Sequence, residues 1–253
     1  MLLAILSDIH ANLEALRAVL ADARARGASR FLSLGDHIGF NGDPSACLDE
    51  LMPLLHAAVQ GNHEAAITHH GLFGVALYTR MITKSAAMLS NAQKQWLAAL
   101  PLTTVHEGLR LMHAPHRGVR WGRVSNCEQA AGVFSLYPEK RLLNGHTHRP
   151  AVFSKNAEGI IEELSPTSPG ADGDTLTLAL DPQRRYLINP GSVGQPRDGD
   201  PRAAYLLFDT EADAVTFCRV PYDVEAAAAK IAAVGLPRSF AEALKRGESP
   251  TGD

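Results

Sequence analysis

The chain has 253 residues, of which 45% are hydrophobic and 20% are charged, and its formal net charge is -3. This balance allows a packed core, argues against a largely disordered chain, and provides no overall positive charge for binding duplex nucleic acid. The three cysteines, Cys47, Cys127 and Cys218, lie far apart, which argues against a disulfide framework and a zinc ribbon.

The amino terminus lacks the features of a targeting segment. Its first residues carry no basic side chain, and Asp8 interrupts the apolar run too early for a signal peptide. No stretch of the sequence approaches the roughly 20 apolar residues that a membrane span requires. We therefore expect a cytoplasmic protein.

The first part of the chain alternates short apolar runs with amphipathic segments. Leu2–Leu6 predicts a strand buried on both faces, and periodic apolar residues after Asn12 predict a helix. Phe31–Leu34 predicts a second strand, a helix starts at Pro44 behind the expected cap Asp43, and residues 57–59 predict a third strand. Such βαβ units form parallel sheets with right-handed crossovers.

The remainder predicts helices and then many strands. Helical patterns extend from Glu64 to Leu100 and recur after Asn126 and over Val224–Val234. The strands expected after residue 100 are 102–106, 109–112, 141–144, 151–153, 160–163, 175–180, 185–188, 203–208 and 214–220. Because no linker separates two cores, we expect one domain over residues 1–253, with a loosely attached tail at about 246–253.

Polar residues of the kinds that bind metals follow several of the apolar runs. They are Asp8, His10, Asp36, Asn62, His63, His113, His146 and His148. A single such residue in a turn is most often a cap or a solvated loop residue. Helix caps and turns do not explain a set so rich in imidazole, and parallel strands bring their carboxyl ends to one edge of a sheet. Oxygen ligands mixed with imidazoles suit manganese, iron or zinc.

These motifs, in this order, resemble those of the calcineurin-like metallophosphoesterases. The matching segments are Asp8-Ile9-His10, Gly35-Asp36, Gly61-Asn62-His63-Glu64, His113 and Gly145-His146-Thr147-His148. Residues 189–197 are similar to a loop of the compact bacterial and archaeal phosphodiesterase branch. The resemblance implies an α/β fold, namely a four-layer αββα sandwich in which helices flank two mixed sheets.

The resemblance also implies a dinuclear metal site and a role for each motif residue. Asp8, His10 and His148 would bind one divalent ion, Asn62, His113 and His146 the other, and Asp36 both. A hydroxide bridging the ions would attack phosphorus, since two cations lower the pKa of the water between them. His63 would assist the leaving oxygen as the catalytic acid. We expect manganese, with iron, zinc or nickel as alternatives.

The sequence leaves the substrate more open than the metal site. His37 and Asn41 follow Asp36 in the same loop, and the guanidinium groups of Arg149 and Arg197 match phosphate oxygens. His116, Arg117, Arg120, Trp121 and Arg123 form either a solvated basic loop or a surface for an anionic substrate that carries a base. We expect a small phosphorylated or nucleotide-like substrate, without duplex nucleic acid or a membrane; a homo-oligomer remains open.

We therefore predict a hydrolase, a metal-dependent phosphoesterase that acts on phosphodiester, phosphoanhydride or phosphomonoester bonds, with a phosphodiesterase as the first choice. The alternatives are a dinucleoside tetraphosphate hydrolase, a protein phosphatase and a non-catalytic scaffold of the same fold. A zinc protease is rejected because the HExxH pattern requires histidine at the position of Ile67. Cys47 is expected to be a small core residue.

Overall fold

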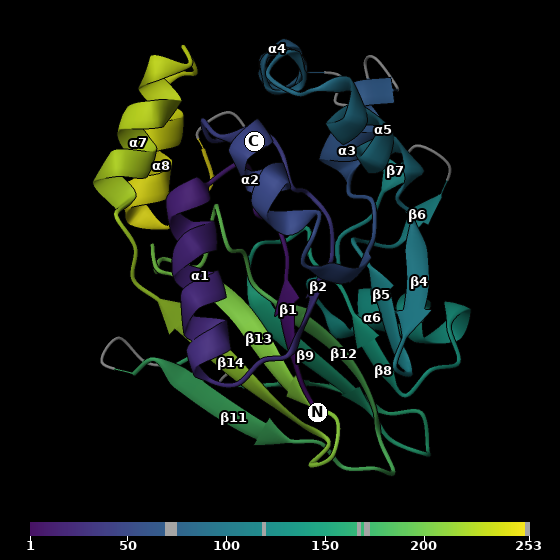
Figure 1. Ribbon diagram of the computed structural model, residues 1–253. Coiled ribbons are helices and arrows are strands. Elements are labelled where there is room, and N and C mark those ends of the chain that lie inside the picture. Colours follow the sequence, from purple (N-terminus) through teal and green to yellow (C-terminus); the bar gives the residue numbers. More distant parts are fainter. Residues whose placement is uncertain (69–74, 118–119, 166–167, 170–172, 251–253) are drawn as a thin grey trace.

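The computed structural model describes residues 1–68, 75–117, 120–165, 168–169 and 173–250. Two six-stranded mixed sheets pack against each other, and helices flank them (Figure 1). A two-stranded ribbon, β6 (His116–Arg117) and β7 (Arg120–Trp121), accompanies them. The predicted four-layer αββα sandwich is confirmed.

The first sheet contains the amino-terminal βαβ units. Its order is β11 (Thr175–Ala179), β14 (Ala214–Val220), β13 (Ala203–Asp209), β1 (Leu2–Leu6), β2 (Arg30–Ser33) and β3 (Leu55–Ala58). The three amino-terminal strands pair in parallel, and their crossovers are α1 (Leu13–Ala25) and α2 (Pro44–Leu51). The later strands pair antiparallel on the other side of β1.

The second sheet is built from the middle of the chain. Its order is β10 (Ile161–Leu164), β9 (Pro150–Lys155), β12 (Arg185–Pro190), β8 (Arg141–Leu143), β5 (Leu109–Met112) and β4 (Thr103–His106). β8 pairs in parallel with both β5 and β12, so these three strands end at one edge. α6 (Cys127–Leu136) packs Val133 and Phe134 against this sheet.

Five further helices surround the edge of the sandwich at which the parallel strands end. They are α3 (Asn62–Thr68), α4 (Ala76–Ala87), α5 (Asn91–Ala99), α7 (Val224–Ala233) and α8 (Arg238–Arg246). α8 was not predicted, although its Phe240 is fully buried. None of the helices in the described part of the chain combines the length and the apolarity that a membrane span needs.

The carboxyl-terminal residues up to 250 contact the loop that follows β12. The carbonyl of Gly247 accepts a hydrogen bond from the amide of Gly199 at 2.9 Å, and the carbonyl of Glu248 accepts one from Gln195 Nε2 at 3.5 Å. These residues belong to the segment for which we expected a loose attachment. Residues 251–253 lie outside the described part of the chain.

Side chains cap several of the helices. The side chain of Asn12 accepts a hydrogen bond from the amide of Ala15 at 3.1 Å, and Ser90 forms a capping box with Gln93. Asp43 occupies the expected position before α2, but it makes no side-chain cap bond. Its carboxylate instead accepts a hydrogen bond from Lys230 Nζ at 2.7 Å, which joins the start of α2 to α7.

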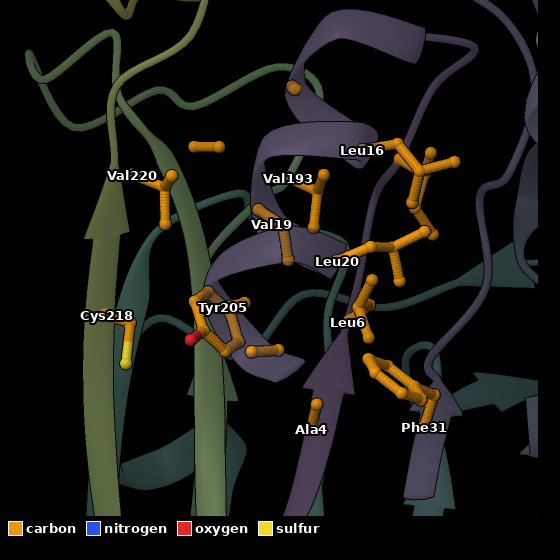
Figure 2. Packing of buried hydrophobic residues seen from close by; sticks show 14 of the residues in the cluster. Ala4, Leu6, Leu16, Val19, Leu20, Phe31, Val193, Tyr205, Cys218 and Val220 are labelled. Carbon is orange, nitrogen blue, oxygen red and sulfur yellow. The ribbon is translucent and has the colours of Figure 1, made fainter. Parts of the chain in front are cut away.

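β1 is buried on both faces, as the sequence predicts. Ala4 and Leu6 belong to the hydrophobic cluster between the sheet and α1, together with Leu16, Val19 and Leu20 of that helix (Figure 2). Leu3 and Ile5 belong to the core between the two sheets. Because alternate side chains of a strand face opposite sides, a single apolar run supplies two hydrophobic cores.

Ile5 tests the contribution of the core between the sheets. We expect Ile5→Ala to lower the free energy of unfolding by about 2–5 kcal/mol, because Ile5 is fully buried and the substitution leaves a cavity. Leu136→Ala is the matched control; that side chain is 61% exposed, so the change should stay within about 0.5 kcal/mol. Urea denaturation of the metal-free protein measures the free energy of unfolding of both variants. Equal losses would contradict the assignment of Ile5 to the core between the sheets.

Candidate metal centre

The seven predicted ligands gather where the central strands of both sheets end. Asp8 and His10 lie in the turn after β1, and Asp36 lies in the turn after β2. Asn62 starts α3. His113 lies in the turn after β5, and His146 and His148 lie in the turn after β8. They form two main groups whose potential ligand atoms lie within 4.8 Å of one another: Asp8, His10 and His148 in the first, and Asp36, His113 and His146 in the second. The tertiary structure therefore brings together residues that are up to 140 positions apart in the sequence.

In the first group, atoms with lone pairs face one another. Nε2 of His10 lies 3.1 Å from Nε2 of His148, while the Nδ1 atoms of these rings contact the carbonyls of Ile38 and Gln195. Since each Nδ1 donates its hydrogen to a carbonyl, each neutral ring presents a lone pair at Nε2. Oδ1 of Asp8 lies 3.3 Å from Nε2 of His148 and is buried without a hydrogen-bond partner. A bound cation would satisfy all three atoms.

The second group has the same character. Nδ1 of His113 contacts the carbonyl of Leu34 at 2.9 Å, so its Nε2 faces the centre of the site. This Nε2 lies 3.0 Å from Asn62 Oδ1, 3.2 Å from His146 Nδ1 and 3.3 Å from Asp36 Oδ2. His113 is fully buried. Four atoms that can donate electron pairs thus converge in a dry environment, as the ligand set of a metal ion requires.

Asp36 lies between the two groups. Its Oδ2 is 3.3 Å from Nε2 of His113 and 3.7 Å from Nε2 of His10. Its Oδ1 accepts a hydrogen bond from the amide of His63 at 3.0 Å, which fixes the orientation of the carboxylate. A carboxylate in this position is within reach of ions in both groups.

The buried charges influence one another strongly. Burial alone would raise the pKa of Asp8, but His148 and His113 hold it well below its usual range. Burial lowers the pKa of His146 to about 3, so this ring is neutral near pH 7 and can bind a metal. Burial would also lower the pKa of His113, but the carboxylate of Asp36 raises it to about 9. The site therefore attracts positive charge.

The turns that carry the ligands adopt an uncommon backbone conformation. Nine described non-glycine residues have positive φ, and five of them are predicted ligands: Asp8, His10, Asp36, His146 and His148. Such conformations cost of order 1–3 kcal/mol each and persist only where the surroundings enforce them. The amide of Asp8 donates to the carbonyl of Gly35 and that of His10 to the carbonyl of Asp36, both at 3.0 Å. These bonds join the turns of β1 and β2.

Glu64 holds the second of these turns, a role that the sequence analysis missed. Its fully buried carboxylate accepts hydrogen bonds from the amides of Asp36, His37 and Gly61 at 2.8–2.9 Å. The approach is close, because a Cβ atom at Gly61 would lie 2.1 Å from Asp36 Oδ1. The signal in the sequence was the acidic residue two positions after Asn62, in the first turn of a helix, where a carboxylate accepts from free amides.

His63 lies beside both groups without occupying the centre of either. Its Nδ1 contacts the carbonyl of Ile38 at 2.9 Å, and its Nε2 is 3.8 Å from Asp36 Oδ2. The ring centroids of His10 and Phe40 lie 4.5 Å and 5.1 Å from that of His63. His10, Asp36 and His63 also form a third group of potential ligand atoms within 4.8 Å. A cavity of about 270 Å³, lined by His63, opens above these residues.

Two of the expected substrate contacts are corrected by the structure. His37 is fully buried; its Nε2 lies 2.8 Å from Ser33 Oγ and its Nδ1 faces Glu64, away from the cavity. Asn41 donates through Nδ2 to the carbonyls of His10 and Gly194 at 2.9 and 3.2 Å. Both side chains brace the turns that hold the ligands, whereas Phe40 of the same loop lines the cavity.

The arginine candidates lie on the open side of the site. Arg197 lines the cavity above the metal ligands, and its guanidinium carbon is 5.2 Å from the ring centroid of Phe40. Arg149 lines an adjoining cavity, and Arg123 lines both. The side chains of His116, Arg117 and Arg120 lie outside the described part of the chain, so the proposed basic loop is represented there by Trp121 and Arg123.

The αββα sandwich with aspartates and histidines at its shared edge is the arrangement of the metallophosphoesterase class. The family model for the calcineurin-like phosphoesterase superfamily domain matches residues 1–213, and the chain belongs to this superfamily. An uncharacterized protein of Methanocaldococcus jannaschii is 31% identical over 257 residues, which cover 96% of this chain and 97% of the relative.

Solved structures agree with this assignment. A metallophosphoesterase from Sphaerobacter thermophilus is 32% identical and superposes with a TM-score of 0.81 over 98% of this chain and 99% of its own. A hypothetical protein from Pyrococcus horikoshii OT3 is 18% identical, with a TM-score of 0.75 over 98% of this chain and 99% of its own. The second likeness shows that the fold is shared at low sequence identity.

Metal binding should release protons. With its pKa at about 9, His113 carries a proton near pH 7 in the metal-free protein, and a metal at Nε2 displaces it. We expect release of about one proton from this residue and a metal affinity that increases as the pH rises toward 9. Calorimetric titrations with Mn²⁺ in two buffers of different ionisation enthalpy measure the release. A pH-independent metal affinity without proton release would contradict the protonation of His113 in the metal-free protein.

Proposed function

We propose that this protein is a phosphoesterase that uses two divalent metal ions to hydrolyse phosphodiester or phosphoanhydride bonds of small substrates. The observation that carries the proposal is the convergence of buried electron-pair donors in two groups, with Asp36 between them. Unless cations or protons lie between them, the lone pairs of these atoms repel one another at 3.0–3.3 Å. Membership in the superfamily and the likeness to a metallophosphoesterase at 32% identity support the same activity.

The donor set matches the ions that we propose. Asp8, His10 and His148 would hold one ion, Asn62, His113 and His146 the other, and Asp36 would contact both. When bound, the two ions supply the Lewis acidity that lowers the pKa of water and clamps phosphate oxygens. Mixed imidazole and oxygen ligands favour manganese, with iron, zinc and nickel as alternatives.

His63 is the residue that we assign as the catalytic acid. Because its Nδ1 donates to the carbonyl of Ile38, its Nε2 is directed toward the site and can deliver a proton there. The carboxylate of Asp36 lies 3.8 Å from this Nε2. Transfer of that proton to the leaving oxygen removes the cost of expelling an alkoxide and contributes about 10²–10⁴-fold to the rate.

The walls of the cavity support an ester that carries an organic group. Phe40, Val75 and Tyr78 provide apolar surface on one side, and the guanidinium of Arg197 provides positive charge on another. This combination suits a phosphate with an organic substituent better than inorganic phosphate. A non-catalytic scaffold is less well supported, since the sequence has a residue of the required type at every predicted ligand position and at His63.

His63 provides the sharpest test of the catalytic role. We expect His63→Ala to lower kcat for bis(p-nitrophenyl) phosphate by about 10²–10⁴-fold, because the leaving oxygen loses its proton donor. The metal content, measured by inductively coupled plasma mass spectrometry, should stay the same. His56→Ala, at an exposed imidazole of β3, is the matched control and should retain activity. Unchanged hydrolysis by His63→Ala would refute the assignment of His63 as the catalytic acid.

A second test addresses the reaction class. Metal-depleted protein should regain activity when it is reloaded with Mn²⁺, and diesters should be hydrolysed faster than monoesters. The assay should compare aryl monoesters, aryl diesters, dinucleoside polyphosphates and phosphopeptides, after reloading with manganese, iron, zinc or nickel. Preference for phosphopeptides would indicate a protein phosphatase. Absence of turnover on every substrate, with the metals bound, would favour the scaffold.

A further inference from the structure

A second cavity of about 440 Å³ adjoins the candidate metal centre. Arg123 and Arg197 line both this cavity and the one above the metal ligands, so the two spaces share a wall of guanidinium groups. The amide of Arg197 also donates a hydrogen bond to the carbonyl of the predicted ligand His148 at 3.3 Å. A backbone hydrogen bond therefore links the second cavity to the metal centre, in addition to the side chains that line both cavities.

Three arginines line the second cavity, and two of them also line the cavity above the metal ligands. They come from distant segments: Arg123 precedes α6, Arg149 precedes β9 and Arg197 follows β12. The pKa of Arg197 is lowered to about 10, mainly by burial, and the positive charges of Arg123 and Arg149 act in the same direction. Among the described residues, neither Arg123 nor Arg149 forms an ion pair or a side-chain hydrogen bond. Like charges gathered in this way favour the binding of an anion.

The rest of the second cavity is suited to an organic group. Val124 and Phe153 provide apolar surface, and Ser125 and Thr147 contribute hydroxyl groups. Glu163 lines the same cavity and can accept hydrogen bonds from a hydroxyl or an amino group. The negative charge of this carboxylate would repel a chain of phosphates that filled the cavity. The same carboxylate can accept hydrogen bonds from the sugar or the base of a nucleoside.

We propose that this cavity, which we call the arginine pocket (Arg123, Ser125, Thr147, Arg149, Glu163 and Arg197), binds a second phosphate and the nucleoside attached to it. The proposal rests on the proposed phosphoesterase function of the metal centre. The preferred substrates are then nucleotides in which at least two phosphates are linked, with one phosphate at the metal centre and the next among the arginines. Arg149 is the residue that distinguishes such substrates from simple diesters, because it lines the arginine pocket and not the cavity above the ligands.

The reaction balances as a hydrolysis. The oxygen of water forms a new bond to the phosphorus at the metal centre, and the bond from that phosphorus to the bridging oxygen breaks. The bridging oxygen leaves with the nucleoside phosphate in the arginine pocket, where the arginines offset its negative charge. The two protons of water are distributed between the two products at the prevailing pH.

Arg149→Ala tests the role of the arginine pocket. For the Mn²⁺-loaded protein, we expect the ratio of kcat/KM for diadenosine tetraphosphate to kcat/KM for bis(p-nitrophenyl) phosphate to fall by about 10- to 100-fold. The loss should appear mainly in KM, and Arg149→Lys should restore part of the ratio because it keeps the charge but loses the planar fork. Arg238→Ala, at an exposed arginine of α8, is the matched control and should leave the ratio unchanged.

The outcomes separate this inference from the proposed function. If bis(p-nitrophenyl) phosphate is hydrolysed but Arg149→Ala leaves the ratio unchanged, the arginine pocket is refuted and the phosphoesterase stands. If the loaded protein hydrolyses neither substrate, the proposed function fails, and calorimetric titration with ADP still decides about the arginine pocket. ADP binding that is at least 10-fold weaker in Arg149→Ala would support the arginine pocket, and equal binding would overturn it.

Discussion

The dominant constraint in this structure is the demand for positive charge where the two sheets meet. Imidazole nitrogens approach one another and the side-chain oxygens of Asp8 and Asn62 to 3.0–3.3 Å, so that in the unprotonated state their lone pairs face one another. Such contacts are unfavourable unless cations or protons separate them, and burial makes them more so because little water screens them. The raised pKa of His113 shows the same demand met by a proton. Metal binding would therefore stabilise the native state as well as prepare the site for chemistry.

The structure around the ligands serves to hold this unfavourable arrangement in place. Backbone carbonyls of Leu34, Ile38 and Gln195 accept hydrogen bonds from the ring nitrogens on the far side, and each imidazole therefore presents the nitrogen that can bind a metal. Glu64 ties together the turns after β2 and β3, and close packing at Gly61 leaves Asp36 little room to move. The ligands are thus positioned by the rigid ends of strands, which favours a preformed site over one assembled by the metal.

The metal centre and the arginine pocket draw on different parts of the fold. The ligands sit directly behind the strands of both sheets, whereas Arg123 and Arg149 lie in segments that lead into α6 and β9. Arg149 directly follows the predicted ligand His148 in the sequence, whereas Arg123 is not next to a predicted ligand. In the proposed function, hydrolysis depends on the metal ligands and His63 and the choice of substrate on the arginine pocket, while Arg197 lines both cavities.

The sequence by itself determined the parallel βαβ units and the set of residues that gathers at the sheet edge, and its resemblance to a known family implied the fold class. These features are local: apolar runs mark strands, and polar residues at their ends are carried to one edge by parallel pairing. Only the tertiary structure decided where side chains within a loop point. His37 and Asn41 turned beneath the site, Asp43 paired with Lys230, and Glu64 became the support of two turns. The physical reason is that the orientation of a loop side chain depends on hydrogen-bond partners and free space that distant segments of the chain provide. Local sequence patterns do not encode these partners.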